Sequence, residues 1–245
     1  VGRTKYVCLE RRWSSDSCQL KAKCQNAALH FPALTYSLFR IMTLQSINIP
    51  DEINRFPHSP AAAHLIDLAN DRIEAFMLAD DLVVENFVPC DFHLLDQAIT
   101  WIEQNHLLTG NRFCELGSGF GVAALLASLR GMESIGIEIE SSLVEQSTSL
   151  AEELGLSAKF YCGSFVPRDI TGILEIARDV EHVETHEGEV YEEIGLGLDD
   201  YDLFFAFPWP GEEQFFEAVF QAGAAVNSLL LSYRGRNGMH LLRKT

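Results

Sequence analysis

The chain has 245 residues, 47% of them hydrophobic, and a formal net charge of −17 at pH 7. This length suits one main domain with an appendage, and no run approaches the roughly eighteen apolar residues that a membrane-spanning helix needs. The acidic balance argues against nucleic acid as the main partner, because proteins that bind its backbone carry basic stripes. We therefore expect no membrane contact, and a small molecule or a basic protein as substrate.

Residues 1–41 differ from the rest of the chain, because their basic side chains far outnumber the acidic Glu10 and Asp16. We expect this segment to lie outside the fold, as an over-extended reading frame or, alternatively, an organelle transit peptide. Residues 42–90 are expected to form an N-terminal helical cover. Residues 91–245 are expected to form the main domain.

The six cysteines show no paired C-x-x-C spacing. Cys114 and Cys162 fall within strands that we expect to be buried. This usage is typical of a reducing compartment and favours neither a zinc site nor a disulfide framework. We therefore expect a cytoplasmic location.

Two helices are predicted ahead of the first strand of the main domain. Ser59 can cap and Pro60 can open the first helix. Its apolar positions recur at helical spacing and are Leu65, Ile66, Ala69, Ile73, Phe76 and Met77. The second helix starts at Asp91, ends before Gly110 and has an apolar face made of Phe92, Leu95, Ile99 and Ile102.

Strands and helices then alternate along the chain. Strands are expected in the runs NRFCELG, SIGIEIE, AKFYCGS, YDLFFAF and SLLLSY, followed by an antiparallel strand in MHLLRK. A helix follows each of the first two strands, and Ser142 with Glu145 predicts a capping box on the second of these helices, which ends at Gly155. This alternation predicts an α/β fold with a doubly wound, mostly parallel sheet and helices on both faces.

Three glycines follow the first of these strands at alternate positions, Gly117, Gly119 and Gly121. A dinucleotide fingerprint needs its third glycine three residues after the second, where this chain has Val122. Glu115, just before the turn, would repel a pyrophosphate and attract a cation. A nucleoside without phosphate and with a positively charged tail suits these features better, because glycines allow close backbone approach.

The acid-x-Gly-x-Gly-x-Gly run resembles the first motif of the class I (Rossmann-like) S-adenosylmethionine-dependent methyltransferases, and the resemblance covers roughly residues 88–235. It implies S-adenosylmethionine as cofactor and methyl transfer as the activity. The acidic balance favours a protein amine or a small molecule over nucleic acid as the methyl acceptor. It assigns cofactor contacts in this turn to Glu115, Leu116, Gly117, Ser118, Gly119 and Gly121. Glu138 would hold the ribose hydroxyls, with Glu140 as the alternative, and Ile139 would lie against the adenine.

Two later loops complete the site that the resemblance implies. Gly163 and Ser164 stand where the family often has Gly-Asp near the adenine. Phe207 follows the fourth strand, where the family often has a polar residue before its prolines, and is expected to contact the cofactor. The residues expected to line the acceptor side and take part in catalysis are Pro208, Trp209 and Glu212.

These departures from the family pattern leave two alternatives open. One is a non-catalytic subunit that has kept the cofactor fold. The other, disfavoured by Glu115 and Val122, is an NAD(P)-dependent oxidoreductase. The family sheet usually has seven strands, so one edge strand is also unaccounted for.

A long acidic tract, residues 175–202, separates the third and fourth strands. It is interpreted as a solvated insertion, with docking of a basic substrate tail as the alternative. His182 and His186 within it are four residues apart. Because no third ligand accompanies them, no metal site is expected.

Overall fold

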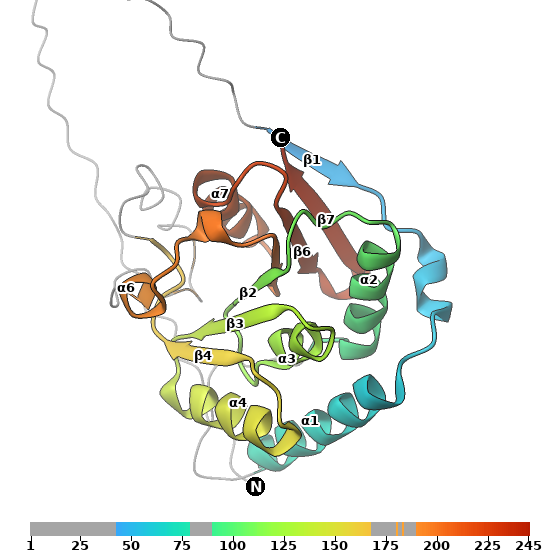
Figure 1. Ribbon diagram of the computed structural model, residues 1–245, viewed down its shortest axis with the longest axis vertical. Helices are drawn as coiled ribbons and strands as arrows, with labels where there is room; N and C mark the ends of the chain where they lie inside the picture. The colour runs from blue at the N-terminus through green and yellow to red at the C-terminus, as the bar shows by residue number, and fades with distance from the viewer. Residues whose placement is uncertain (1–42, 79–89, 168–179, 181–182, 184–189) are drawn as a thin grey trace, which may run out of the picture. The chain divides into compact units, whose positions relative to one another are not determined.

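The computed structural model describes residues 43–78, 90–167, 180, 183 and 190–245. These residues form a seven-stranded sheet in the order β1-β7-β6-β5-β2-β3-β4 (Figure 1). Strands β2 to β6 pair in parallel, whereas β7 is antiparallel to both β6 and β1. The strands are β1 Leu44–Ile47, β2 Arg112–Leu116, β3 Glu133–Glu138, β4 Lys159–Cys162, β5 Leu203–Ala206, β6 Leu229–Tyr233 and β7 Met239–Lys244. The predicted fold class is confirmed.

The strand that sequence reasoning left unaccounted for is β1. It pairs with β7 in register from Leu44 opposite Lys244 to Ile47 opposite Leu241. Thr43 extends the pairing, because its N–H donates to the Thr245 carbonyl and its own carbonyl accepts the Thr245 N–H. The segment expected to be a helical cover therefore also supplies a strand to the sheet.

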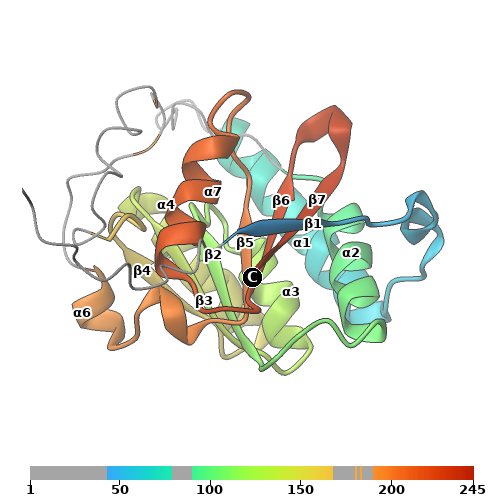
Figure 2. The same ribbon diagram turned by 90° about the horizontal axis from the view of Figure 1, so that it is seen from above.

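Helices cover both faces of the sheet (Figures 1 and 2). One face carries α1 Pro60–Leu78, α2 Phe92–Gln104, α3 Val122–Leu129 and α4 Ser141–Leu154, and the other carries α6 Val190–Ile194 and α7 Glu213–Gly223. Short 3₁₀ turns are η1 Asp51–Arg55, η3 Leu198–Asp200 and η4 Gly235–Asn237. No helix of the described part is long and apolar enough to cross a membrane.

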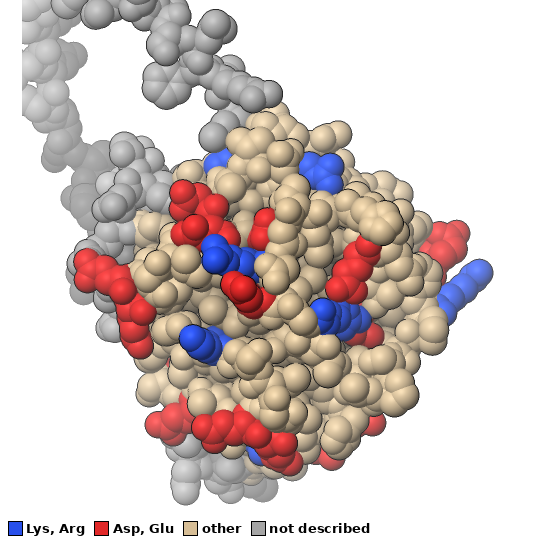
Figure 3. Space-filling model, viewed as in Figure 1, with Lys and Arg blue, Asp and Glu red and all other residues tan. Residues whose placement is uncertain are grey.

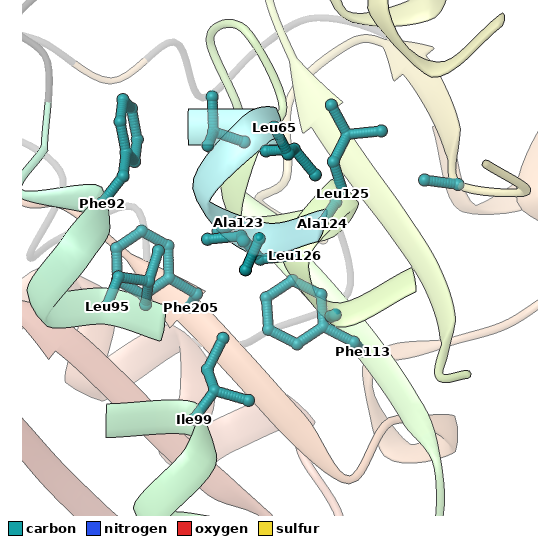
Figure 4. Packing of buried hydrophobic residues seen from close by; sticks show 14 of the residues in the cluster. Leu65, Phe92, Leu95, Ile99, Phe113, Ala123, Ala124, Leu125, Leu126 and Phe205 are labelled. Carbon is teal, nitrogen blue, oxygen red and sulfur yellow. The ribbon is translucent and has the colours of Figure 1, made fainter. Parts of the chain in front are cut away.

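Strand side chains alternate between two hydrophobic cores, one on each face. Phe113 of β2 and Phe205 of β5 belong to the core under α1–α4, whereas Cys114 and Phe204 belong to the core under α6 and α7. Figure 4 shows Leu95 of α2 pointing toward Phe113 and Phe205 in the space between helix and sheet. The sheet is thus buried from both sides, as a parallel sheet requires.

Helix starts follow the sequence in two cases and differ in a third. Ser59 Oγ accepts the Ala62 N–H at 3.1 Å, so the predicted cap forms. Asp91, where the second helix was expected to start, is the N-cap of that helix, because its Oδ1 accepts the Leu94 N–H at 3.0 Å. The capping box predicted on α4 is wrong. The N-cap lies two residues earlier than predicted, at Glu140 instead of Ser142, and it makes no side-chain cap bond.

Two side chains expected to be buried are exposed. Met77 is 57% exposed, because it lies in the last turn of α1, beyond the buried stripe that ends at Ile73. Cys162 is exposed because β4 is the edge strand and Cys162 is its last residue. Cys114, on the central strand β2, is buried as predicted.

A buried cluster of charged side chains ties α2 to the end of α3. Asp96 is 1% exposed, and its Oδ1 lies 2.5 Å from Arg130 Nη2. Its Oδ2 lies 2.6 Å from His58 Nδ1. Arg130 also donates to Thr100 Oγ1 at 2.8 Å and lies 3.3 Å from Glu103 Oε2. Both carboxylate oxygens of Asp96 therefore have a hydrogen-bond partner in this cluster, and the Arg130 guanidinium has acidic and hydroxyl partners.

Candidate functional site

The candidate site lies at the carboxyl ends of four neighbouring strands. Leu116 at the end of β2 pairs with Ile137 of β3 and with Ala206 of β5, and Glu138 pairs with Cys162 of β4. The loops that follow these strands therefore emerge at one edge of the sheet. The order in which the chain adds strands reverses between β2 and β5, although these two strands are parallel. Open α/β sheets bind ligands at such a point.

The glycines of the turn after β2 differ in what they accommodate. Gly117 has a φ of +74°, and a Cβ added to it would meet nothing within 4 Å. A Cβ on Gly121 would lie 2.2 Å from the ring of Phe160, and one on Gly136 would lie 2.7 Å from the same ring. Gly117 thus leaves its backbone open to a ligand, whereas Gly121 is required by packing against β4.

Glu115 does not face open space beside the turn. Its carboxyl is 4% exposed, and Oε2 accepts the Ala124 N–H of α3 at 2.9 Å. Burial raises the pKa of Glu115 to about 8, against the lowering effect of the Ala124 and Ala123 N–H groups. The sequence predicted the acid but not its orientation, which is set by the amino end of α3.

Glu138 is held by backbone donors at the end of β3. Oε2 accepts the Gly119 N–H at 2.7 Å, and Oε1 accepts the N–H groups of Ile139 at 2.8 Å and Glu140 at 3.1 Å. Burial raises its pKa, while these donors act in the opposite direction. Glu140, the alternative, is exposed and caps α4. The carboxylate that joins the glycine turn to β3 is therefore that of Glu138.

Two residues expected in the cofactor site direct their side chains into the protein. Ser118 is 5% exposed, and its Oγ has no hydrogen-bond partner among the described residues. It packs against the backbone of Gly136. Leu116 is 1% exposed, in the core under α6 and α7. The Ser118 N–H is also engaged within the protein, because it donates to the Ile137 carbonyl at 3.0 Å.

The loop after β4 lies next to Glu138. The Gly163 N–H donates to the Glu138 carbonyl at 2.9 Å. Ser164 is 3% exposed, and its Oγ accepts the Val166 N–H at 3.2 Å. Ile139, between the two strands, is half-buried. The structure thus brings Ile139, Gly163 and Ser164 beside Glu138.

The loop after β5 combines buried and accessible side chains. Pro208 is buried, and Phe207 and Trp209 are half-buried. Glu212 is 6% exposed, and its N–H donates to the Trp209 carbonyl at 2.9 Å to close the turn into α7. The residues expected on the acceptor side are therefore contiguous with the carboxyl edge.

Sequence reasoning missed Tyr233 at this edge. It ends β6 and follows Ser232, which pairs with Ala206, so its ring lies beside that of Phe207 with centroids 5.0 Å apart. Burial raises the pKa of Tyr233, with further contributions from Cys90 and Asp91 at the start of α2. The signal lay in the strand order, because Tyr233 reaches the site only once β6 pairs with β5.

Metal binding finds no support at this edge. The described residues contain no group of three side chains that could hold a metal ion. His182 and His186 lie outside the described residues, as does most of the acidic tract between β4 and β5.

Lysine and arginine side chains on the face drawn in Figure 3 are scattered among acidic ones and form no continuous basic stripe.

No family model matches the chain, and no curated protein is similar to it. Among solved structures it is similar to an RNA methyltransferase from Salinibacter ruber in complex with S-adenosyl-L-homocysteine, at 15% identity and a TM-score of 0.44 over 64% of this chain and 93% of that one. A methyltransferase from Geobacter sulfurreducens gives 13% identity and 0.44 over 78% and 93%. Because the sequence identities and TM-scores are this low, the site is interpreted from the geometry of this chain alone.

Proposed function

We propose that this chain is an S-adenosylmethionine-dependent methyltransferase of class I. The proposal rests on the glycine turn after β2. This turn is open at Gly117, and its Gly119 N–H donates to the Glu138 carboxylate on the adjacent strand. Gly117 leaves room for close approach of a ligand, and a carboxylate can accept the two hydroxyls of a ribose. The seven-stranded sheet with a reversed β7 is also the sheet that the sequence resemblance implies.

The residues at this edge suit a nucleoside with a cationic tail. The cationic tail of the cofactor would lie beside Gly117, next to the backbone of Leu116, Ser118 and Gly119. The Glu115 carboxyl would lie behind this turn. Glu138 would bind the ribose, and Ile139, Gly163 and Ser164 would surround the adenine on the β4 side. Phe207, on the β5 side, would lie between the cofactor and the acceptor. When bound, S-adenosylmethionine supplies a methyl group on a sulfonium, a good leaving group. The protein's own contribution is therefore alignment of the acceptor in a dry site.

The acceptor side is proposed to be the loop after β5. Pro208 and Trp209 would form its wall, and Glu212 would orient or accept a proton of the acceptor. Phe207 replaces a polar side chain that could bond a nucleobase amine, and the net charge of −17 disfavours a nucleic acid. A protein amine or a small molecule is therefore the acceptor class that we propose.

Calorimetric titration with S-adenosylhomocysteine tests the proposal. We expect the chain to bind it, and Glu138→Ala to weaken binding by about 1–3 kcal/mol through loss of charge-assisted bonds to the ribose. Glu138→Gln, which keeps the shape, should lose about 1 kcal/mol. The matched control Glu140→Ala removes an exposed carboxylate two residues away and should change the affinity less than about twofold.

The outcomes separate the alternatives. Absence of S-adenosylhomocysteine binding, or a thermal shift with NADH alone, would overturn the proposal. Equal losses in Glu138→Ala and Glu140→Ala would remove Glu138 from the ribose site. Tight binding without transfer of a labelled methyl group into any component of a cell extract would favour a non-catalytic subunit.

A further inference from the structure

Two aromatic side chains lie at the ends of neighbouring strands, on the face of the sheet that α2 covers. Phe207 follows β5 and Tyr233 ends β6, and both pack against the core beneath α1–α4. Their ring planes are tilted by 57°, so they form a corner rather than a flat stack. Both side chains are half-buried, which leaves part of each ring accessible at the carboxyl edge.

A carboxylate lies at the rim of this aromatic corner. Cys90 packs against the same core as the two rings, and Asp91 directly follows it at the start of α2. Asp91 is exposed and uses Oδ1 to cap Leu94. Its charge raises the pKa of Tyr233, and its neighbour Cys90 packs against the same core as both rings, so we place the carboxylate near the corner.

The two arginines that follow Tyr233 in the chain are engaged elsewhere or lie within a turn. Arg234 follows Tyr233 but extends to the opposite face of the sheet, where Nη2 lies 2.5 Å from Glu217 Oε1 of α7. Arg236 is exposed within the turn between β6 and β7. The corner therefore combines aromatic faces with negative charge.

We propose that Phe207, Tyr233 and Asp91 bind a positively charged amine group of the methyl acceptor. Aromatic faces attract ammonium groups, and more strongly when the site is partly desolvated. A carboxylate at the rim adds attraction and selects against anionic molecules. This inference rests on the proposed function for the identity of the ligand as an acceptor, but the binding site itself can be tested without methyl transfer.

The test uses choline as the cationic probe and 3,3-dimethylbutan-1-ol as its neutral isostere, titrated into the full chain with saturating S-adenosylhomocysteine. We expect choline to bind at least about fivefold more tightly than the neutral probe, because only the cation gains from the ring faces. Equal affinities for the two probes, or no binding of choline, would overturn the inference.

Four variants locate the binding. Tyr233→Leu should weaken choline about 3- to 20-fold, whereas Tyr233→Phe, which keeps the ring, should stay within about twofold. Asp91→Asn should weaken it about threefold at low salt, because asparagine keeps the helix cap but loses the charge. Asp67→Asn makes the same charge change at an exposed position of α1 and should have no effect.

Each result decides the proposal. If Tyr233→Phe loses as much affinity as Tyr233→Leu, the hydroxyl and not the ring binds the probe, and the inference is wrong. If Tyr233→Leu does not fold, the comparison of choline with its neutral isostere and the effect of Asp91→Asn still test the proposal. Binding of S-adenosylhomocysteine is measured in every sample, so its absence in the unmodified chain contradicts the proposed function, whereas its presence without choline selectivity contradicts only this inference.

Discussion

Two buried carboxyl groups under α1–α4 are treated in opposite ways. Asp96 of α2 is 1% exposed and has Arg130 and His58 against its two oxygens. Glu115 of β2 is 4% exposed, and within the described residues no cation lies at ion-pair distance from it. Its bonds come from the backbone of α3, and burial raises its pKa to about 8.

We propose that the difference separates a structural acid, Asp96, from an acid kept for a ligand, Glu115. A buried charge that holds a fold needs its counter-charge built in, as Asp96 has in Arg130. A buried acid with only neutral donors costs stability when ionised, and such groups concentrate at functional sites. Glu115 lies behind the open Gly117 turn, where a cationic ligand tail would supply the missing charge.

The largest expected effect is at Asp96. Asp96→Ala leaves Arg130 buried without its main partner, so the free energy of unfolding should fall by about 4 kcal/mol, or about 10 °C in melting temperature. Urea unfolding followed by circular dichroism measures it. Asp67→Ala, at an exposed site in α1, is the control and should stay within about 0.5 kcal/mol. A loss at Asp96 no larger than the control would mean that the cluster holds nothing together.

A smaller effect with a pH signature is expected at Glu115. Folding raises its pKa from 4.5 to about 8, so between these values the unfolded chain has lost a proton that the folded chain keeps. The contribution of Glu115 to the free energy of unfolding therefore falls as the pH rises from 4.5 to about 8, and it is constant above that pH. Glu115→Gln cannot ionise, so it should gain roughly 3 kcal/mol relative to the unmodified chain between pH 5 and pH 9.

Urea unfolding of both proteins across this range provides the measurement, and the difference between them isolates Glu115 from the other titrating groups. Parallel pH profiles would show that Glu115 is ionised throughout. In that case an unrecognised counter-charge is present, and the contrast with Asp96 disappears.

The smallest expected effect is at Ser118, a buried polar group with neither a counter-charge nor a hydrogen-bond partner among the described residues. Ser118→Ala removes an unsatisfied hydroxyl, so stability should be unchanged or rise by up to about 1 kcal/mol. Affinity for S-adenosylhomocysteine should change less than about twofold, because the side chain packs against Gly136 and not at the edge. A clear loss of affinity would return the hydroxyl to the cofactor site.

Local patterns sufficed for much of this fold. The apolar spacing of Phe92, Leu95, Ile99 and Ile102 predicted α2, and Asp91 predicted its first residue, because both signals act within a few residues. The glycine run predicted the turn after β2 for the same reason. Glu115 and Glu138 were predicted as site residues from their positions near the ends of two strands, which also needs no long-range information.

The remainder depends on contacts between distant residues. The run Leu44–Ile47 carries a weak pattern and becomes a strand because β7 is beside it. The spacing of the glycines could not separate Gly117 from Gly121, since the difference is the Phe160 ring, contributed by β4. Tyr233 and the partners of Asp96 were missed for the same reason, and the individual cofactor and acceptor contacts remain predictions.

Pairing of β1 with β7 also sets an order in time during synthesis. Thr43 and Thr245, which close this pairing, are 202 positions apart. At about 5–20 residues per second, β1 leaves the ribosome roughly 10–40 s before its partner is complete. During that interval β1 has no strand to join. After β6 is made and before β7 is complete, the apolar β6, which is buried in the finished sheet, forms the outer edge of the sheet. Translation that stalls before Met239 would leave both strands open to pairing with other chains, which is the circumstance in which sheet edges aggregate.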